Sequence, residues 1–216
     1  MIEKLKNISF PVIITLVYIG FFYFCVSFYV DKELLLSIRE LSSINVGPRF
    51  ILDFIASLLV IIVILVKTLV RKRPLSDFGL TVELPVITAI LLVIYAGLFF
   101  YNGDFSLIGF YTAFFYLVIV AFSEEFVFRG FLFTSVNREY NFWVAAITSG
   151  LLWGAAHAVV PIVIHGGDIV ASVLNELGGG IAAGTGFAFL YKKSRTLFVP
   201  VLIHAILDYS GYIFRA

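Results

Sequence analysis

Long runs of apolar residues dominate this sequence, and they limit the structures that it can adopt. A helix needs about 20 consecutive apolar residues to cross the hydrocarbon core of a membrane. Stretches of about this length lie at residues 8–30, 50–70, 84–101, 107–134, 142–164, 169–191 and 196–214. They are too long and too uniformly apolar for the alternating strands of a membrane β-barrel. We therefore predict an all-α polytopic helical bundle with about seven spans, within a range of roughly six to eight.

The composition agrees with a lipid environment. Hydrophobic residues make up 61% of the 216 residues and charged residues 13%, against roughly 45–50% and 25% in soluble domains. A soluble chain of this length has too small an interior to bury so much apolar surface. The formal net charge of +1 offers no basic surface for nucleic acid, and the single cysteine, Cys25, excludes a disulfide framework. The expected partner is the lipid bilayer.

Lys and Arg are distributed unevenly among the segments between the predicted spans. One set of segments carries nine of them and the alternate set carries four. Because cytoplasmic loops are enriched in Lys and Arg, we expect a multi-pass protein with a cytoplasmic N-terminus and an outer C-terminus. If two spans were merged, or if one were re-entrant, the segments after it would change sides of the membrane. The compact chain fits a prokaryotic plasma membrane. The nine residues are Lys4, Lys6, Arg71, Lys72, Arg73, Arg138, Lys192, Lys193 and Arg195.

Ionisable residues inside the predicted spans call for an explanation. A charged side chain at the centre of a bilayer costs about 2.5–3.5 kcal/mol on insertion scales. Such residues should therefore pair with one another or perform a function. Asn175 and Glu176 fall farther outward in their span, where they could instead cap or kink a broken helix. The ionisable residues that we place together are Glu124, Glu125, Arg129, His157, His204 and Asp208.

Helical spacing suggests how some of these residues pair. Glu125 and Arg129 are four residues apart and share a helical face, so they can form an ion pair. Glu124 lies about 100° around the helix and would remain available, although the opposite assignment is also open. His204 and Asp208 are again four residues apart, so the carboxylate could orient the imidazole. Taken alone, His157 is compatible with an ordinary core histidine.

Together these residue types can hydrolyse an amide in two ways. Glu124, His157 and His204 could bind Zn²⁺ and leave its fourth position open for water. Alternatively, Glu124 could act as a general base on water while the histidines stabilise the oxyanion. The sequence contains neither the H-E-x-x-H helix of soluble zinc proteases nor the G-x-S-x-G elbow of serine hydrolases.

The order of three motifs resembles a known family. Glu124-Glu125-x-x-x-Arg129, Trp153-x-x-x-His157 and His204-x-x-x-Asp208 are together similar to the CPBP family of intramembrane proteases. That family includes CAAX prenyl endopeptidases and the bacteriocin-processing or immunity proteins also called Abi. Residues 73–80 resemble a short segment that often precedes the family core. Trp153 stands where Phe is more usual, and Asp208 stands where Asn is common in eukaryotic members.

This resemblance implies one integral membrane domain, 1–216, with its active site inside the bilayer. The core would span about 105–214 and follow N-terminal spans at 8–30, 50–70 and 84–101. Glu124 would be the catalytic glutamate and His157 would hold the catalytic water or metal. His204 and Asp208 would complete the site and stabilise the oxyanion, with Glu125 and Arg129 in support. The implied activity is endoproteolysis of a peptide or lipidated protein, with or without Zn²⁺.

Two other functions remain open from the sequence. The first is a non-catalytic membrane immunity or regulatory protein with the same fold, although the complete set of motifs argues against lost catalysis. The second is an ion-coupled transporter, in which intramembrane acids and histidines are also expected. A transporter would be expected to show two matched halves with broken helices, whereas the polar residues here gather in the C-terminal half. Nothing in the sequence indicates the substrate or the oligomeric state.

Overall fold

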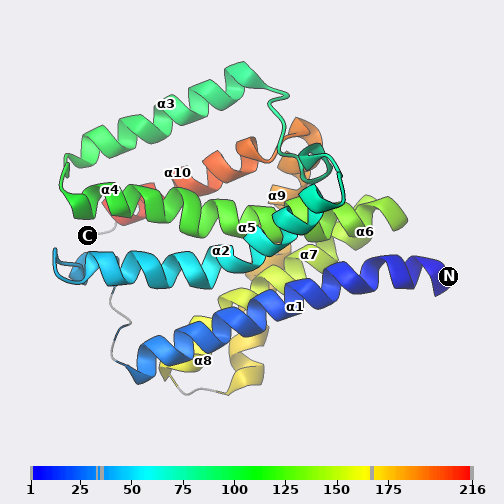
Figure 1. The fold of residues 1–216 in the computed structure, drawn as a ribbon, viewed down its shortest axis with the longest axis horizontal. Coiled ribbons are helices and arrows are strands. Elements are labelled where there is room, and N and C mark those ends of the chain that lie inside the picture. The colour runs from blue at the N-terminus through cyan, green and yellow to red at the C-terminus, as the bar shows by residue number, and fades with distance from the viewer. Residues whose placement is uncertain (1, 33, 35–36, 166–167, 215–216) are drawn as a thin grey trace. The chain divides into compact units, whose positions relative to one another are not determined.

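The computed structural model describes residues 2–32, 34, 37–165 and 168–214, and these residues are mainly helical, with no β-strand among them (Figure 1). The helical segments long and apolar enough to cross a membrane are Glu3–Asp31, Val46–Val70, Pro85–Asn102, Leu107–Glu139 and Phe142–Ile164. They coincide closely with the first five predicted spans. The prediction of an all-α polytopic membrane protein is therefore confirmed.

The last two predicted spans are also helical, but they differ from the other five. Helix α9 (Ile169–Ser194) has 26 residues and is less apolar, because it contains Asn175, Glu176 and several glycines. Helix α10 (Phe198–Phe214) is apolar but has only 17 residues. Since α9 continues through Asn175 and Glu176, the alternative of a broken helix at that point was wrong.

The chain divides into two compact units. Unit 1 comprises residues Met1–Leu35 and Phe126–Lys193, and unit 2 comprises Leu36–Glu125 and Ser194–Ala216. The boundary between Glu125 and Phe126 falls inside the continuous helical segment Leu107–Glu139. Each unit has its own packing.

Unit 1 is built around the first helix, α1 (Ile2–Asp31). The ring of Tyr18 meets that of Phe128 edge to face, with 6.2 Å between centroids. Near the start of α1, the Asn7 amide donates to Glu139 Oε1 at 2.8 Å and the Lys4 ammonium donates to the Glu139 carbonyl at 3.1 Å. The elements that pack against α1 are η4 (Phe126–Phe133), α6 (Thr134–Glu139), α7 (Phe142–His157) and α8 (Val159–His165).

Glycines bring α7 and α9 into backbone contact within unit 1. A Cβ atom on Gly180 would lie only 2.5 Å from Gly154 Cα, and one on Gly184 would lie 2.7 Å from Gly150 Cα. This confirms that glycines of α9 serve close helix packing. Gly179 has nothing within 4 Å of a built Cβ atom, so the tight contact depends on particular glycines of the run.

Unit 2 contains the last helix, α10, which packs against α3 and η3 (Figure 1). The Leu197 N–H donates to the Gly79 carbonyl at 2.7 Å, just before α10 begins. Gly79 has φ of 73°, a left-handed conformation that favours glycine. This contact ties the start of α10 to the 73–80 segment. The other elements are η1 (Ile38–Glu40), α2 (Val46–Val70), η2 (Leu75–Phe78), α3 (Pro85–Asn102), α4 (Leu107–Phe114), η3 (Phe115–Phe122) and α5 (Ser123–Glu125).

One charge inside the α2 span is neutralised locally. Asp53 is buried, and its Oδ2 lies 2.7 Å from Arg49 Nε, one helical turn earlier. The Tyr111 hydroxyl donates to the same carboxylate oxygen. A buried charge with both an ion pair and a hydrogen bond avoids most of the penalty for an isolated one. These contacts explain how unit 2 accommodates Asp53.

Candidate active site

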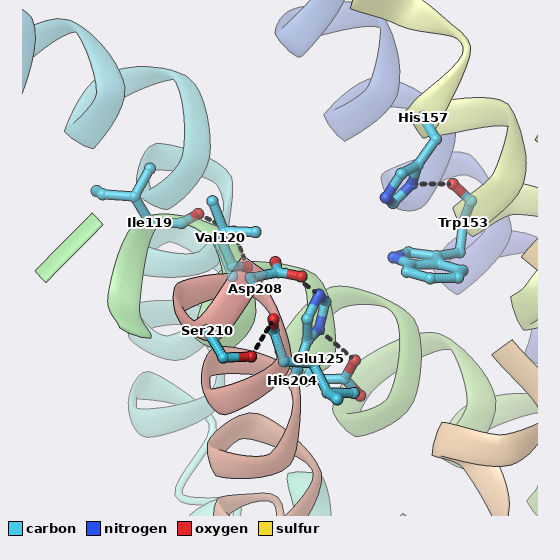
Figure 2. A network of polar contacts seen from close by, with 10 residues as sticks. Ile119, Val120, Glu125, Trp153, His157, His204, Asp208 and Ser210 are labelled. Carbon is cyan, nitrogen blue, oxygen red and sulfur yellow. Dashed lines mark hydrogen bonds and ion pairs between the residues drawn. The ribbon is translucent and has the colours of Figure 1, made fainter. Parts of the chain in front are cut away.

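A buried histidine lies between two carboxylates in unit 2. His204 Nδ1 is 3.0 Å from Glu125 Oε1, and His204 Nε2 is 3.3 Å from Asp208 Oδ2. Figure 2 shows the imidazole ring with one carboxylate at each nitrogen. Glu125 is fully buried and His204 is 5% exposed, whereas the Asp208 side chain is 37% exposed. The contact therefore has a buried side at Glu125 and an accessible side at Asp208.

The two helices present these groups in different ways. His204 and Asp208 are one turn apart on α10, so they share a face as the spacing predicts. Glu125 ends the short α-helical turn α5, which lies between the π-helical segments η3 and η4. The Ser123 hydroxyl contacts the Ile119 and Val120 carbonyls at 2.5 and 3.2 Å. Local π-helical winding is rare and frequently accompanies functional sites.

Glu124 lies beside this contact. Its side chain is partly buried, and it is close enough to His204 to interact with the ring electrostatically. The structure thus gathers Glu124, Glu125, His204 and Asp208 within unit 2. It gives Glu125, expected only in support, the direct contact with His204. The predicted ion pair between Glu125 and Arg129 stays a prediction.

A group of tyrosines lies near Asp208 that the sequence motifs did not predict. The rings of Tyr116 and Tyr209 have centroids 5.8 Å apart, and Tyr209 stacks on Tyr212 at 6.1 Å. Tyr116 and Tyr212 line a cavity of about 530 Å³ together with Asp208. The signal for Tyr212 was present, because it follows His204 and Asp208 at the next four-residue step of α10. Tyr116 lies on another element and carries no such signal.

His157 and Arg129 belong to unit 1. His157 is exposed, and its Nδ1 lies 3.0 Å from the Trp153 carbonyl oxygen. Arg129 is fully buried, with its guanidinium 4.7 Å from the Trp153 ring centroid and 5.2 Å from that of Phe187. The faces of aromatic rings attract a guanidinium, and this attraction partly compensates Arg129 for the water that it loses on burial. Trp153 therefore contacts both His157 and Arg129, the two residues of unit 1 that the sequence predicted for the site.

The described residues fit a metal site poorly. Within this part of the chain, no group of three or more His, Cys, Asp or Glu side chains is arranged to hold a metal ion. A histidine binds a metal through a ring nitrogen that carries a lone pair. Both ring nitrogens of His204 are already in contact with carboxylates. His204 would have to give up one of these contacts to become a ligand.

Comparison with known proteins finds a family similar to the part of the chain that contains these residues. Residues 105–210 match the family described as type II CAAX prenyl endopeptidase Rce1-like. The match includes all six residues predicted for the site. This match, which covers just under half of the chain, supports a CPBP family protein. The resemblance read from the three CPBP motifs is thereby confirmed.

A curated relative matches part of the same chain. The "Putative membrane peptidase YdiL" of Bacillus subtilis (strain 168) is 28% identical over 85 residues, which is 39% of this chain and 29% of that protein. The matched part thus spans less than a third of that relative. No solved structure matches. With its several apolar helices, this chain is an integral membrane protein.

Proposed function

We propose that the chain is an intramembrane endopeptidase. It would hydrolyse a peptide bond in a membrane-associated substrate, either a CAAX-type C-terminus or the precursor of a secreted peptide. The observation that carries this proposal is the buried contact of His204 with Glu125 and Asp208, beside Glu124 and within the segment that matches the family. A purely structural role would not require a further acid, Glu124, next to this contact.

The proposed reaction uses Glu124 as a general base and needs no metal. Glu124 takes a proton from water while the water oxygen bonds to the peptide carbonyl carbon. The carbonyl electron pair moves onto oxygen, and His204 stabilises the resulting oxyanion by turning its Nε2–H from Asp208 to that oxygen. When the oxyanion collapses, the C–N bond breaks and the leaving nitrogen takes the proton from Glu124. Before the reaction, Glu125 and Asp208 hold the ring from its two nitrogens.

The remaining residues predicted from the sequence lie in unit 1. The roles expected for them, holding the catalytic water for His157 and support of the site for Arg129, stay predictions. We also propose a cytoplasmic N-terminus and a prokaryotic plasma membrane as the setting.

The direct test is cleavage of a fluorogenic peptide library by the purified protein in detergent. Glu124→Gln and His204→Ala should each lower the rate by about 100-fold or more, the usual contribution of a positioned acid or base. Glu83→Gln is the matched control, because Glu83 is an exposed acid outside the site, and its rate should equal that of the wild type. Full activity in Glu124→Gln would refute the assignment of the base.

A chelator arm of the same assay separates the two routes to hydrolysis. Activity should survive removal of divalent cations, because the base and the oxyanion donor both belong to the chain. Loss of activity on chelation, with recovery on adding Zn²⁺, would instead establish the metal route. Absence of cleavage by the wild type across the library would favour the non-catalytic regulatory function.

A further inference from the structure

The cavity beside Asp208 is lined in part by an arginine from outside the segment that matches the family. Its volume of about 530 Å³ lies within the range of small-ligand sites, roughly 300–1,000 Å³. Arg39 of η1 is the one basic residue among the described residues that line it. Because the family match begins at residue 105, Arg39 is a feature of this chain's N-terminal part. The lining residues are Arg39, Tyr116, Leu207, Asp208, Gly211 and Tyr212.

Arg39 is held against α10 by two contacts with one residue. Its Nη2 donates to the Tyr212 carbonyl at 2.7 Å, and its guanidinium carbon lies 5.2 Å from the Tyr212 ring centroid. These contacts place the exposed guanidinium at the cavity by fixing a long side chain that would otherwise sample many rotamers. A preorganised side chain loses less entropy when it binds a ligand.

The turn that carries Arg39 is itself held by a side chain. Glu40 Oε2 accepts a hydrogen bond from the Ser37 backbone N–H at 2.7 Å. This hydrogen bond keeps the pKa of Glu40 below its usual range, so the carboxylate is charged at neutral pH. The η1 turn is thereby stabilised around Arg39.

The cavity lies between the Arg39 guanidinium and the proposed catalytic groups, because Arg39 and Asp208 both line it. Asp208, which lines the cavity, contacts His204 Nε2 at 3.3 Å. The Tyr116 hydroxyl interacts electrostatically with both Arg39 and Asp208. A ligand in this cavity can therefore approach the guanidinium and the His204 contact together. A guanidinium presents its N–H donors in a planar fork that matches a carboxylate.

We infer that Arg39 binds a carboxylate of the peptide substrate, first of all its free C-terminal carboxylate. This inference rests on the proposed function, since it assigns the cavity to the molecule being cut. Arg39 thus determines specificity by favouring a peptide with a free C-terminal acid over the corresponding amide. The phosphate of a lipid headgroup is the competing ligand, and the experiment below separates it from the peptide.

The test uses peptides of identical sequence with a free C-terminal acid or a C-terminal amide. Arg39→Gln should raise KM for the acids about tenfold, the value of one charge-assisted contact, and leave kcat nearly unchanged. KM for the amides should be the same in both proteins. Arg39→Lys should recover part of the effect, because the charge stays while the fork is lost. Arg73→Gln is the matched control, since Arg73 is exposed and lies outside the cavity lining.

Each outcome decides the inference. Selective loss for the acids in Arg39→Gln supports it, and a third set of amidated peptides with an added Glu shows whether a side-chain carboxylate can substitute. Equal effects on acids and amides, or none, would overturn it. So would an Arg39→Gln defect confined to binding of phosphatidylglycerol added to the detergent. Arg39→Lys keeps the test valid if Arg39→Gln unfolds at a lower temperature than Arg73→Gln.

Failure of the proposed function is distinguishable from failure of this inference. If the wild type cleaves no peptide, fluorescence anisotropy of the labelled acids and amides still measures binding. Tighter binding of the acids by the wild type, abolished in Arg39→Gln, would uphold Arg39 as a carboxylate site in a non-catalytic protein. Equal binding of acids and amides would overturn the inference even if the chain is a peptidase.

Discussion

At the scale of single residues, the position of the His204 ring is set by the carboxylates of Glu125 and Asp208. Its ring has a fully buried carboxylate at Nδ1 and a partly exposed carboxylate at Nε2. Removing one member of a buried charged pair leaves the other uncompensated, which is more costly than losing a surface pair. Glu125 therefore positions His204, while Asp208 connects it to the cavity.

Glu125→Ala should lower the free energy of unfolding by about 3–5 kcal/mol, because His204 Nδ1 loses its buried partner. Glu125→Gln should cost less, since its amide oxygen can still accept a hydrogen bond from the ring. The measurement is denaturant unfolding in detergent. Glu83→Ala, at an exposed loop position, is expected to change stability by no more than about 0.5 kcal/mol. Equal stability of Glu125→Ala and Glu83→Ala would contradict a structural contribution from this contact.

At the scale of elements, the helical segment Leu107–Glu139 changes its winding around the site. Residues 115–122 and 126–133 are π-helical, and only Ser123–Glu125 between them is α-helical. The four-residue spacing that pairs Glu125 with Arg129 assumes α-helical winding throughout. The length of the apolar run predicted that this segment is a helix, but nothing in the run indicated the π-helical turns.

The α7–α9 contact supplies a prediction with an internal control. Gly180→Ala should lower the free energy of unfolding by about 1–3 kcal/mol, because its Cβ would overlap the backbone at Gly154. Gly179→Ala has open space and gains helix propensity of up to about 1 kcal/mol. Thermal unfolding of the two variants in the same detergent should therefore shift in opposite directions. Two shifts of the same sign and size would show that α7 and α9 are not closely packed.

At the scale of the whole molecule, the segments between the spans set a testable orientation. Five helical segments meet the length and hydropathy expected for crossing, while α10 is shorter and α9 more polar. If all seven cross the membrane, the excess of Lys and Arg places the N-terminus inside and the C-terminus outside. The prediction of a single domain stays a prediction beside the two compact units.

Reporter fusions check this orientation. A fluorescent protein that folds only in the cytoplasm should fluoresce when fused at the N-terminus or inserted after Lys193, and stay dark at the C-terminus. Alkaline phosphatase, which is active only outside, should give the reverse pattern. Substituting Lys192 and Lys193 with Gln tests the contribution of their charges. A cytoplasmic C-terminus would show that α9 or α10 does not cross.

The sequence alone determined the membrane environment, the long helices and the residues from which a site could be made. These follow from local composition and from spacing within one helix, which need no knowledge of distant contacts. Only the tertiary structure decided that Glu125 contacts His204, 79 residues away, and that Arg39 contacts Tyr212, 173 residues away. Such contacts depend on how helices pack, and helices in lipid are apolar on nearly every face, so periodicity does not reveal which faces meet.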